Sequence, residues 1–200
     1  MLANLRDYMA DSPVLFTLSR KIIELNFVKE KRLLRSILDL ESPKITLDIG
    51  CGTGEFAPLF ARHDYTGIDI SPRYIEYAAA RRPKGKFRVM DATNLEFADN
   101  SFDCVLIMGV LHHLGDDEVE KVLAEAKRVT RPGGTISITE DAHIDDLKNW
   151  FVRLVQKFDK GDGIRTPAEY MKIFGRLFRV TGQRQFRSGG SIYFSVVATK

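Results

Sequence analysis

The stretch Leu47-Asp48-Ile49-Gly50-Cys51-Gly52-Thr53-Gly54-Glu55-Phe56 decides the fold of this 200-residue chain. Residues 45–49 form a short apolar run that predicts a strand, and the three glycines predict a turn directly after it. The spacing predicts a helix from about residue 56 to residue 62. Small residues let the backbone approach a ligand closely, and a helix N-terminus supplies free N–H groups. The stretch therefore predicts a ligand-binding loop between a strand and a helix.

The glycines alone leave three interpretations open: a dinucleotide site, a site for a methyl-donor nucleoside, or a tight turn. Asp48 favours the second, because a carboxylate two residues before the first glycine repels a pyrophosphate and can accept hydrogen bonds from an ammonium group. The dinucleotide fingerprint GxGxxG also needs a glycine where Glu55 stands. A nicotinamide oxidoreductase is therefore disfavoured.

Strands and helices alternate through the middle of the chain. Strands are expected at 65–70, 86–90, 102–108 and 135–140, with helices opened by Ser71-Pro72 and over 116–130. Helices at 144–158 and 167–176 are expected to follow. The runs 177–186 and 191–199 read as an antiparallel hairpin joined at Ser188-Gly189-Gly190. This alternation predicts an α/β fold, a mostly parallel sheet with helices on both faces.

The first 42 residues carry apolar side chains at helical spacing and are expected to form a helical cover on the core. A membrane-surface helix is the alternative for this leader. No linker is visible, so residues 1–200 are interpreted as one domain: cover 1–42, cofactor-binding core 43–141, and substrate-side helices and hairpin 142–200. No apolar run is long enough to span a membrane, and no signal-peptide pattern opens the chain. A cytoplasmic location is expected.

The charge is unevenly distributed along the chain. The net formal charge is +1 over residues 1–42, −4 over 43–141 and +6 over 142–200. The basic tail is either a solvated surface or a face toward an anionic acceptor. It lacks the interleaved aromatic residues of an RNA-binding module, so nucleic acid is a minority expectation. The two cysteines, Cys51 and Cys104, have no spacing typical of a zinc site or a disulfide framework.

Two further acids end strands after the glycine loop. Asp69 closes the second strand about twenty residues on, where a carboxylate can accept from both hydroxyls of a ribose. Asp91, followed by Ala92, is placed to accept from an adenine amino group. A turn-forming role is the alternative for Asp91, because aspartate is common in turns.

By four stretches the chain resembles the class I S-adenosylmethionine-dependent methyltransferases, in the branch called methyltransferase type 11. The stretches are LDIGCGTGEF, GIDISPRYIEYA, MDATNLEFADNSFDCVLIMGVLHHL and RVTRPGGTISITE, which together span residues 45–140. The resemblance implies a Rossmann-like three-layer sandwich with a seven-stranded sheet and an antiparallel C-terminal hairpin. It implies S-adenosylmethionine as cofactor, with S-adenosylhomocysteine as product, and no metal.

The resemblance also implies site residues. The methionine part is expected at Asp48, Gly50, Cys51, Gly52 and Gly54, with the Cys51 thiol idle. The ribose and adenine are expected at Asp69, Ile70, Asp91 and Ala92. Met108 and Gly109 are expected to line the cofactor with backbone groups, although Gly109 replaces the larger polar residue often found there.

Four side chains are candidates for the acceptor side of the site. His112 and His113 follow the fourth strand, where either is a general base or merely orients the loop. Arg165 and Tyr170 adjoin a glycine-containing segment and are candidate acceptor contacts, or parts of a capped surface loop. His143 is a weaker candidate base. The expected function is methyl transfer to a small-molecule or lipid-like acceptor. A non-catalytic cofactor-binding partner and an RNA or protein methyltransferase are the alternatives.

Overall fold

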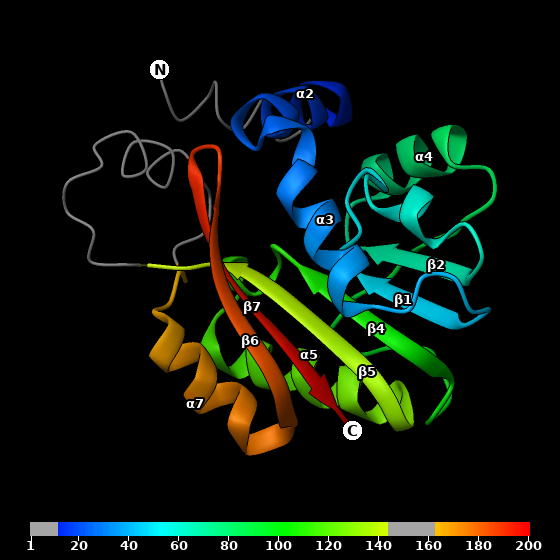
Figure 1. Cartoon of the computed structure of the whole chain (residues 1–200). Coiled ribbons are helices and arrows are strands. Elements are labelled where there is room, and N and C mark those ends of the chain that lie inside the picture. Colours follow the sequence, from blue (N-terminus) through cyan, green and yellow to red (C-terminus); the bar gives the residue numbers. More distant parts are fainter. Residues whose placement is uncertain (1–11, 144–162) are drawn as a thin grey trace.

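The computed structural model describes residues 12–143 and 163–200. Its strands form one seven-stranded sheet in the order β3-β2-β1-β4-β5-β7-β6, in which β7 is antiparallel to both of its neighbours and the other pairs are parallel. The strands are β1 Ile45–Ile49, β2 Asp64–Asp69, β3 Lys86–Val89, β4 Phe102–Met108, β5 Thr130–Asp141, β6 Arg179–Ser188 and β7 Ser191–Thr199. The predicted α/β class, seven-stranded sheet and edge hairpin are confirmed (Figure 1).

The helices are α2 Pro13–Ile23, α3 Val28–Ile37, α4 Pro72–Arg81, α5 Asp116–Val129 and α7 Pro167–Leu177. Short 3-10 segments are η1 Leu25–Phe27, η2 Ala57–Phe60 and η3 Leu111–His113. Three helices start on the predicted pattern of a hydroxyl residue followed by proline: Ser12, Ser71 and Thr166 each accept a hydrogen bond from a backbone N–H three residues on. The predicted helix at 144–158 lies outside the described residues.

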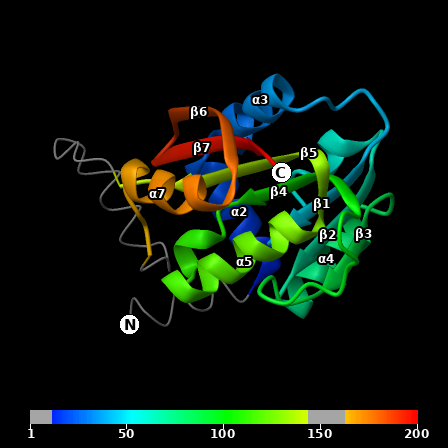
Figure 2. The same ribbon diagram turned by 90° about the horizontal axis from the view of Figure 1, so that it is seen from below.

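Alternation along the strands places apolar side chains on both faces of the sheet. Leu47 and Ile49 of β1 join the larger core with the apolar faces of α5 and α7, whereas Leu34 of α3 and Phe60 of η2 pack on the other face. Figure 2 shows the sheet between α3 on one side and α5 and α7 on the other. Because β1, β2, β4 and β5 run parallel, their carboxyl ends lie together at one edge of the sheet.

The structure corrects the predicted helix at 56–62. Only the 3-10 turn η2 forms, with i→i+3 hydrogen bonds from Leu59 N to Phe56 O and from His63 N to Phe60 O. The physical reason is length, because β2 already begins at Asp64 and leaves room for little more than one turn after the glycines. The loop therefore lacks the long helix that was expected to point its N-terminus at a ligand.

Two other predictions need adjustment. The RPGG turn was expected before the fifth strand but lies inside β5. The strand is irregular there, because Phe102 of β4 pairs with Thr130 whereas Cys104 pairs with Thr135. The leader is only partly a core cover: Phe27, Leu33, Leu34 and Leu38 are buried, but α2 has no buried residue. Within the described residues, no helix is long and apolar enough to cross a bilayer.

Candidate functional site

The glycine loop after β1 takes a left-handed backbone at all three glycines, with φ of +70° at Gly50, +52° at Gly52 and +70° at Gly54. A Cβ at Gly50 would overlap Cγ2 of Val110, which follows β4, so this glycine allows two loops to touch. A Cβ at Gly52 would meet no atom within 4 Å. The space at Gly52 is thus open to a ligand, and the bare backbone lets that ligand approach.

Asp69 joins this loop to the end of β2. Its Oδ2 accepts from Gly52 N at 2.9 Å, and its Oδ1 accepts from Ser71 N at 2.9 Å. Burial raises the pKa of the carboxyl, while these backbone donors act to lower it. The carboxylate therefore lies beside the open face of Gly52, where the sequence predicts a ribose contact.

Asp48 is more enclosed than the sequence suggests. Its carboxyl is buried within β1 and accepts from the hydroxyl of Tyr65 at 2.5 Å. Burial raises the pKa of Asp48 to about 7; the Tyr65 hydrogen bond opposes this shift and the charge of Asp69 adds to it. The ammonium role of Asp48 stays a prediction, and Tyr65 is a direct partner that the sequence did not reveal.

Asp91 follows β3 and has the turn geometry that was the alternative to an adenine contact. Oδ1 of Asp91 accepts from both N and Oγ1 of Thr93 at 2.8 Å, and these bonds lower the pKa of the carboxyl. Ala92 is half-buried beside it, and Ile70 is 74% exposed after Asp69. An exposed isoleucine next to these two acids offers an apolar contact for a flat ring.

The end of β4 is held by a residue that the sequence analysis missed. Glu140 of β5 is fully buried and accepts from Val110 N and Leu111 N, both at 3.0 Å, and from His112 Nδ1 at 2.8 Å. These three bonds fix the turn after Met108 and Gly109, where Gly109 has φ of +67°. A single carboxylate in the otherwise uncharged run TISITE was the available signal.

The two neighbouring histidines differ sharply in their surroundings. His112 is fully buried against Glu140, whereas His113 is exposed, with its ring centroid 4.0 Å from that of His112. The geometry of His112 suits the loop-orienting alternative. His143 is exposed and donates its backbone N–H to Arg165 O.

Arg165 and Tyr170 belong to the framework around this turn. Arg165 binds Asp116 Oδ1 through Nη2 at 2.6 Å and reaches the carbonyl oxygens of Leu111 and Leu114 at 3.2 Å. Tyr170 is fully buried and donates to Asp141 O at 3.2 Å. These contacts favour structural roles, and an acceptor contact by either residue stays a prediction.

The cysteines are free and buried, as predicted. Burial raises the pKa of the Cys51 thiol well above its usual range, with the charges of Asp48 and Asp69 acting in the same direction. The thiol is therefore unreactive, while Cys51 N donates to Ile68 O and anchors the loop to β2. Among the described residues, no group of three or more His, Cys, Asp or Glu could hold a metal ion.

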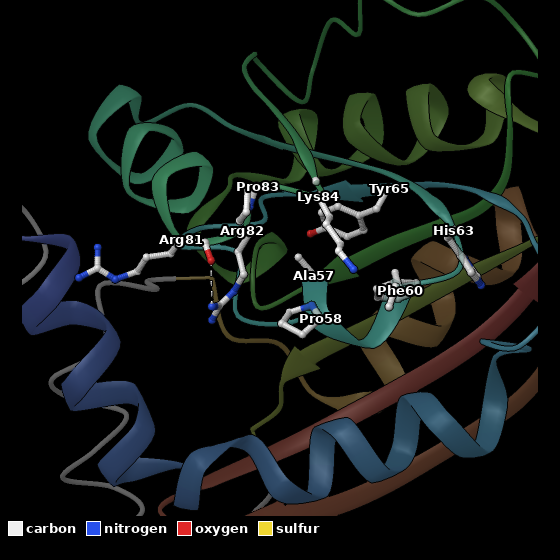
Figure 3. A pocket seen from close by; sticks show the side chains of 11 residues that line it. Ala57, Pro58, Phe60, His63, Tyr65, Arg81, Arg82, Pro83 and Lys84 are labelled. Carbon is white, nitrogen blue, oxygen red and sulfur yellow. Dashed lines mark hydrogen bonds between the residues drawn. The ribbon is translucent and has the colours of Figure 1, made fainter.

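A separate concavity of about 360 Å³ lies between η2 and the α4–β3 connection. In Figure 3, the side chain of Lys84 points toward the region where Tyr65 and Phe60 lie, whereas Arg81 extends away from the cavity. Its lining contains none of the strand-end carboxylates. It meets the glycine loop at Gly54, whose carbonyl oxygen accepts from Arg82 Nε at 3.2 Å and from Ala57 N at 3.3 Å.

The site as a whole is an acidic edge with a glycine-lined opening. Asp48, Asp69 and Glu140 end three different strands of one sheet, and such an edge suits a ligand that carries positive charge and hydroxyl donors. α2 covers this edge, because Thr17 Oγ1 donates to Thr53 Oγ1 at 2.9 Å and Phe16 stacks on Tyr74 at 5.0 Å.

Comparison with known proteins agrees with this geometry. Residues 47–138 match the family model described as a methyltransferase domain. A demethylmenaquinone methyltransferase from Renibacterium salmoninarum is 40% identical over 99 residues, which are 48% of this chain and 41% of that protein. A tRNA (carboxymethyluridine(34)-5-O)-methyltransferase from Arabidopsis thaliana is 32% identical over 56% of this chain and 28% of that protein. The chain thus spans less than half the length of either relative.

A solved structure extends the likeness over most of the chain. The S-adenosylmethionine-dependent methyltransferase from Methanosarcina mazei is 25% identical, with a TM-score of 0.68 over 84% of this chain and 96% of that one. The matched segment contains the glycine loop, the acids that end β2 and β3, and the turn after β4. Residues 47–138 thus match a methyltransferase domain, and the fold that holds them is shared with an S-adenosylmethionine-dependent methyltransferase.

Proposed function

We propose that this protein transfers the methyl group of S-adenosylmethionine to a small-molecule or lipid-like acceptor. The observation that carries the proposal is the open space at Gly52, bordered by the carboxylate of Asp69. A nucleoside fits there because the bare backbone allows close approach and the carboxylate can accept from ribose hydroxyls.

The chain offers groups for each part of the cofactor. Asp69 holds the ribose, and the loop from Gly50 to Gly54, with Asp48 beneath it, holds the methionine part. Asp91, Ala92 and the exposed Ile70 flank the adenine. The backbone of Met108 and Gly109 lines the opposite wall, in the position that Glu140 fixes.

The bound cofactor supplies a methyl group on a positively charged sulfur, already activated for displacement. The protein's own task is then to hold donor and acceptor in line, which can contribute several kcal/mol to lowering the barrier. Glu140 and His112 are positioning residues in this account, because their bond fixes the turn after β4. His113, which is exposed on the same turn, is the candidate general base.

The relatives suggest two acceptor classes. The demethylmenaquinone methyltransferase supports a quinone-like, lipid-like acceptor. The tRNA methyltransferase supports an RNA acceptor as the second candidate, and the +6 charge of residues 142–200 is the feature of this chain that favours it. A non-catalytic role is disfavoured by the intact glycine loop.

The test is an acceptor screen that measures release of S-adenosylhomocysteine with quinols, anionic lipids, amines and tRNA as separate pools. We expect product only with the quinol or lipid pools. Product with tRNA alone would replace the lipid-like acceptor with the second candidate. Cofactor binding without product in any pool would favour the non-catalytic alternative. The variant Asp69→Ala, which lacks the ribose contact, is the control for cofactor-dependent signal.

A further inference from the structure

Helix α2 carries apolar side chains on the face that points away from the protein as well as on the face that contacts it. Its polar side chains point to the protein: Thr17 bonds to Thr53, and Arg20 pairs with Glu24, which is 1% exposed, and reaches the Tyr193 hydroxyl at 3.3 Å. Its apolar side chains Val14 and Leu18 are 52% and 54% exposed, and Ile22 is 68% exposed. Val14, Leu18 and Ile22 follow one another at four-residue spacing and therefore form an apolar stripe on the outside of the helix.

Two more exposed apolar side chains follow the α2 stripe in the chain. Leu25 is 63% exposed and Val28, on the first turn of α3, is 50% exposed. Among the described residues, only Ile70 and Val89 are other large apolar side chains with comparable exposure. Five of the seven such residues therefore lie within fifteen positions of the chain, which marks a contact surface rather than scattered surface residues.

The charges next to the stripe indicate what covers it. Arg32 and Arg35 follow Val28 at helical spacing on the same face of α3, both are exposed, and neither forms an ion pair with another described residue. Glu24 and Glu30, the acids among residues 12–35, are both buried, so a second copy docked through the same segment would bring arginines to the interface without an exposed acid from that segment to pair with them. An anionic bilayer instead suits both the apolar side chains and the two arginines. Apolar side chains enter the bilayer interface, and arginines contact the anionic headgroups.

The stripe also lies directly outside the candidate site. The inner face of the same helix contacts Thr53 of the glycine loop, and Phe16 stacks on Tyr74 of α4 at 5.0 Å. We propose that the outer face of α2, with Leu25, Val28, Arg32 and Arg35, docks the protein on the surface of an anionic lipid bilayer. The docking proposal rests on the proposed function for its purpose, because docking places the site beside acceptors that are dissolved in the membrane.

The experiment is co-sedimentation of the full-length protein with vesicles of phosphatidylcholine containing phosphatidylglycerol, and with phosphatidylcholine vesicles alone. No cofactor or acceptor is present, so failure of methyl transfer cannot be mistaken for failure of docking. The test variant is Leu18→Glu with Ile22→Glu. The matched control is Val89→Glu, since Val89 is 51% exposed but lies on the edge strand β3. Circular dichroism and thermal unfolding check that every variant is folded.

We expect the parent protein to bind the anionic vesicles. The double glutamate variant should lower the partition coefficient at least about tenfold, since two exposed apolar side chains that enter the bilayer interface are lost. Val89→Glu should leave it unchanged, and Arg32→Gln with Arg35→Gln should lower it about tenfold on anionic vesicles only. Absence of binding by the parent protein would overturn the proposal, as would equal binding by the double glutamate variant. Light scattering that shows a dimer broken by the same two glutamates, without vesicle binding, would assign the stripe to a second copy.

Discussion

The carboxylate of Glu140 at the end of β5 lies 2.8 Å from Nδ1 of His112, in the turn after β4, and both side chains are fully buried. The same carboxylate accepts from two consecutive backbone N–H groups. One side chain thus fixes the wall of the site across from the glycine loop.

Replacing Glu140 should therefore weaken both the fold and the cofactor site. Glu140→Ala leaves three buried donors without an acceptor, and we expect the free energy of unfolding to fall by about 3–5 kcal/mol. Urea unfolding and calorimetric titration with S-adenosylhomocysteine measure the two effects. His113→Ala, which changes an exposed neighbour, is the control and should leave stability unchanged. A stable Glu140→Ala variant with full cofactor affinity would contradict this role.

The glycine loop allows a comparison in which backbone strain is matched. Gly52 and Gly133 both have positive φ, and a Cβ at either would meet no atom within 4 Å. Alanine at either position should lower the free energy of unfolding by about 1–2 kcal/mol. Only Gly52→Ala should also weaken S-adenosylmethionine binding, because its Cβ would enter the space left for the ligand. Equal affinities of the two variants, measured by calorimetry, would place the ligand elsewhere.

Asp69 is expected to contribute most of the ribose recognition. Asp69→Ala should weaken cofactor binding by about 1.5–3 kcal/mol, the scale of hydrogen bonds to a charged group. Asp64→Ala is the matched control, because Asp64 opens the same strand and pairs with Lys86 away from the site. Unchanged affinity in a folded Asp69→Ala variant would show that the ribose is held by other groups.

The raised pKa of Asp48 predicts that the stability of the protein depends on pH. Its pKa in the folded protein is raised to about 7, above the usual 3.8, so the folded state retains a proton that the unfolded state loses. The free energy of unfolding should therefore decrease as pH rises from about 4 to about 7 and then level off. Glu24, whose pKa burial also raises to about 7, contributes in the same direction.

The variants Asp48→Asn and Glu24→Gln separate these two contributions. Each should remove a part of the decrease in stability between about pH 4 and pH 7, and the two changes together should remove more of it than either alone. Tyr65→Phe should act oppositely, since it removes the hydrogen bond that favours the charged carboxylate. An unchanged pH profile in Asp48→Asn would mean that this carboxyl is ionised throughout the range.

The strands and the hairpin at the sheet edge could be predicted because their signals are local. Short apolar runs such as residues 102–108, hydroxyl–proline caps and the glycine cluster each specify an element within a few residues. The strand-end acids Asp48, Asp69 and Asp91 were found for the same reason. Their positions follow from where each strand stops.

The features that the sequence did not predict depend on contacts between distant segments. Glu140 and His112 are 28 positions apart, and only the parallel pairing of β4 with β5 brings them together. Arg165 was a candidate acceptor contact because it adjoins a glycine-containing segment, yet its guanidinium binds Asp116, 49 positions away. The outward apolar face of α2 was missed because periodicity identifies an amphipathic helix without showing which face meets the core.

The most direct test of the central claim is calorimetric titration of the parent protein with S-adenosylmethionine and, separately, with NAD. Both ligands contain adenosine, but only the first carries the ammonium and sulfonium groups that the acidic edge of the sheet suits. We predict one S-adenosylmethionine site per chain, weakened by Asp69→Ala, and no heat of binding with NAD. Tight binding of NAD, or no binding of S-adenosylmethionine, would contradict the account.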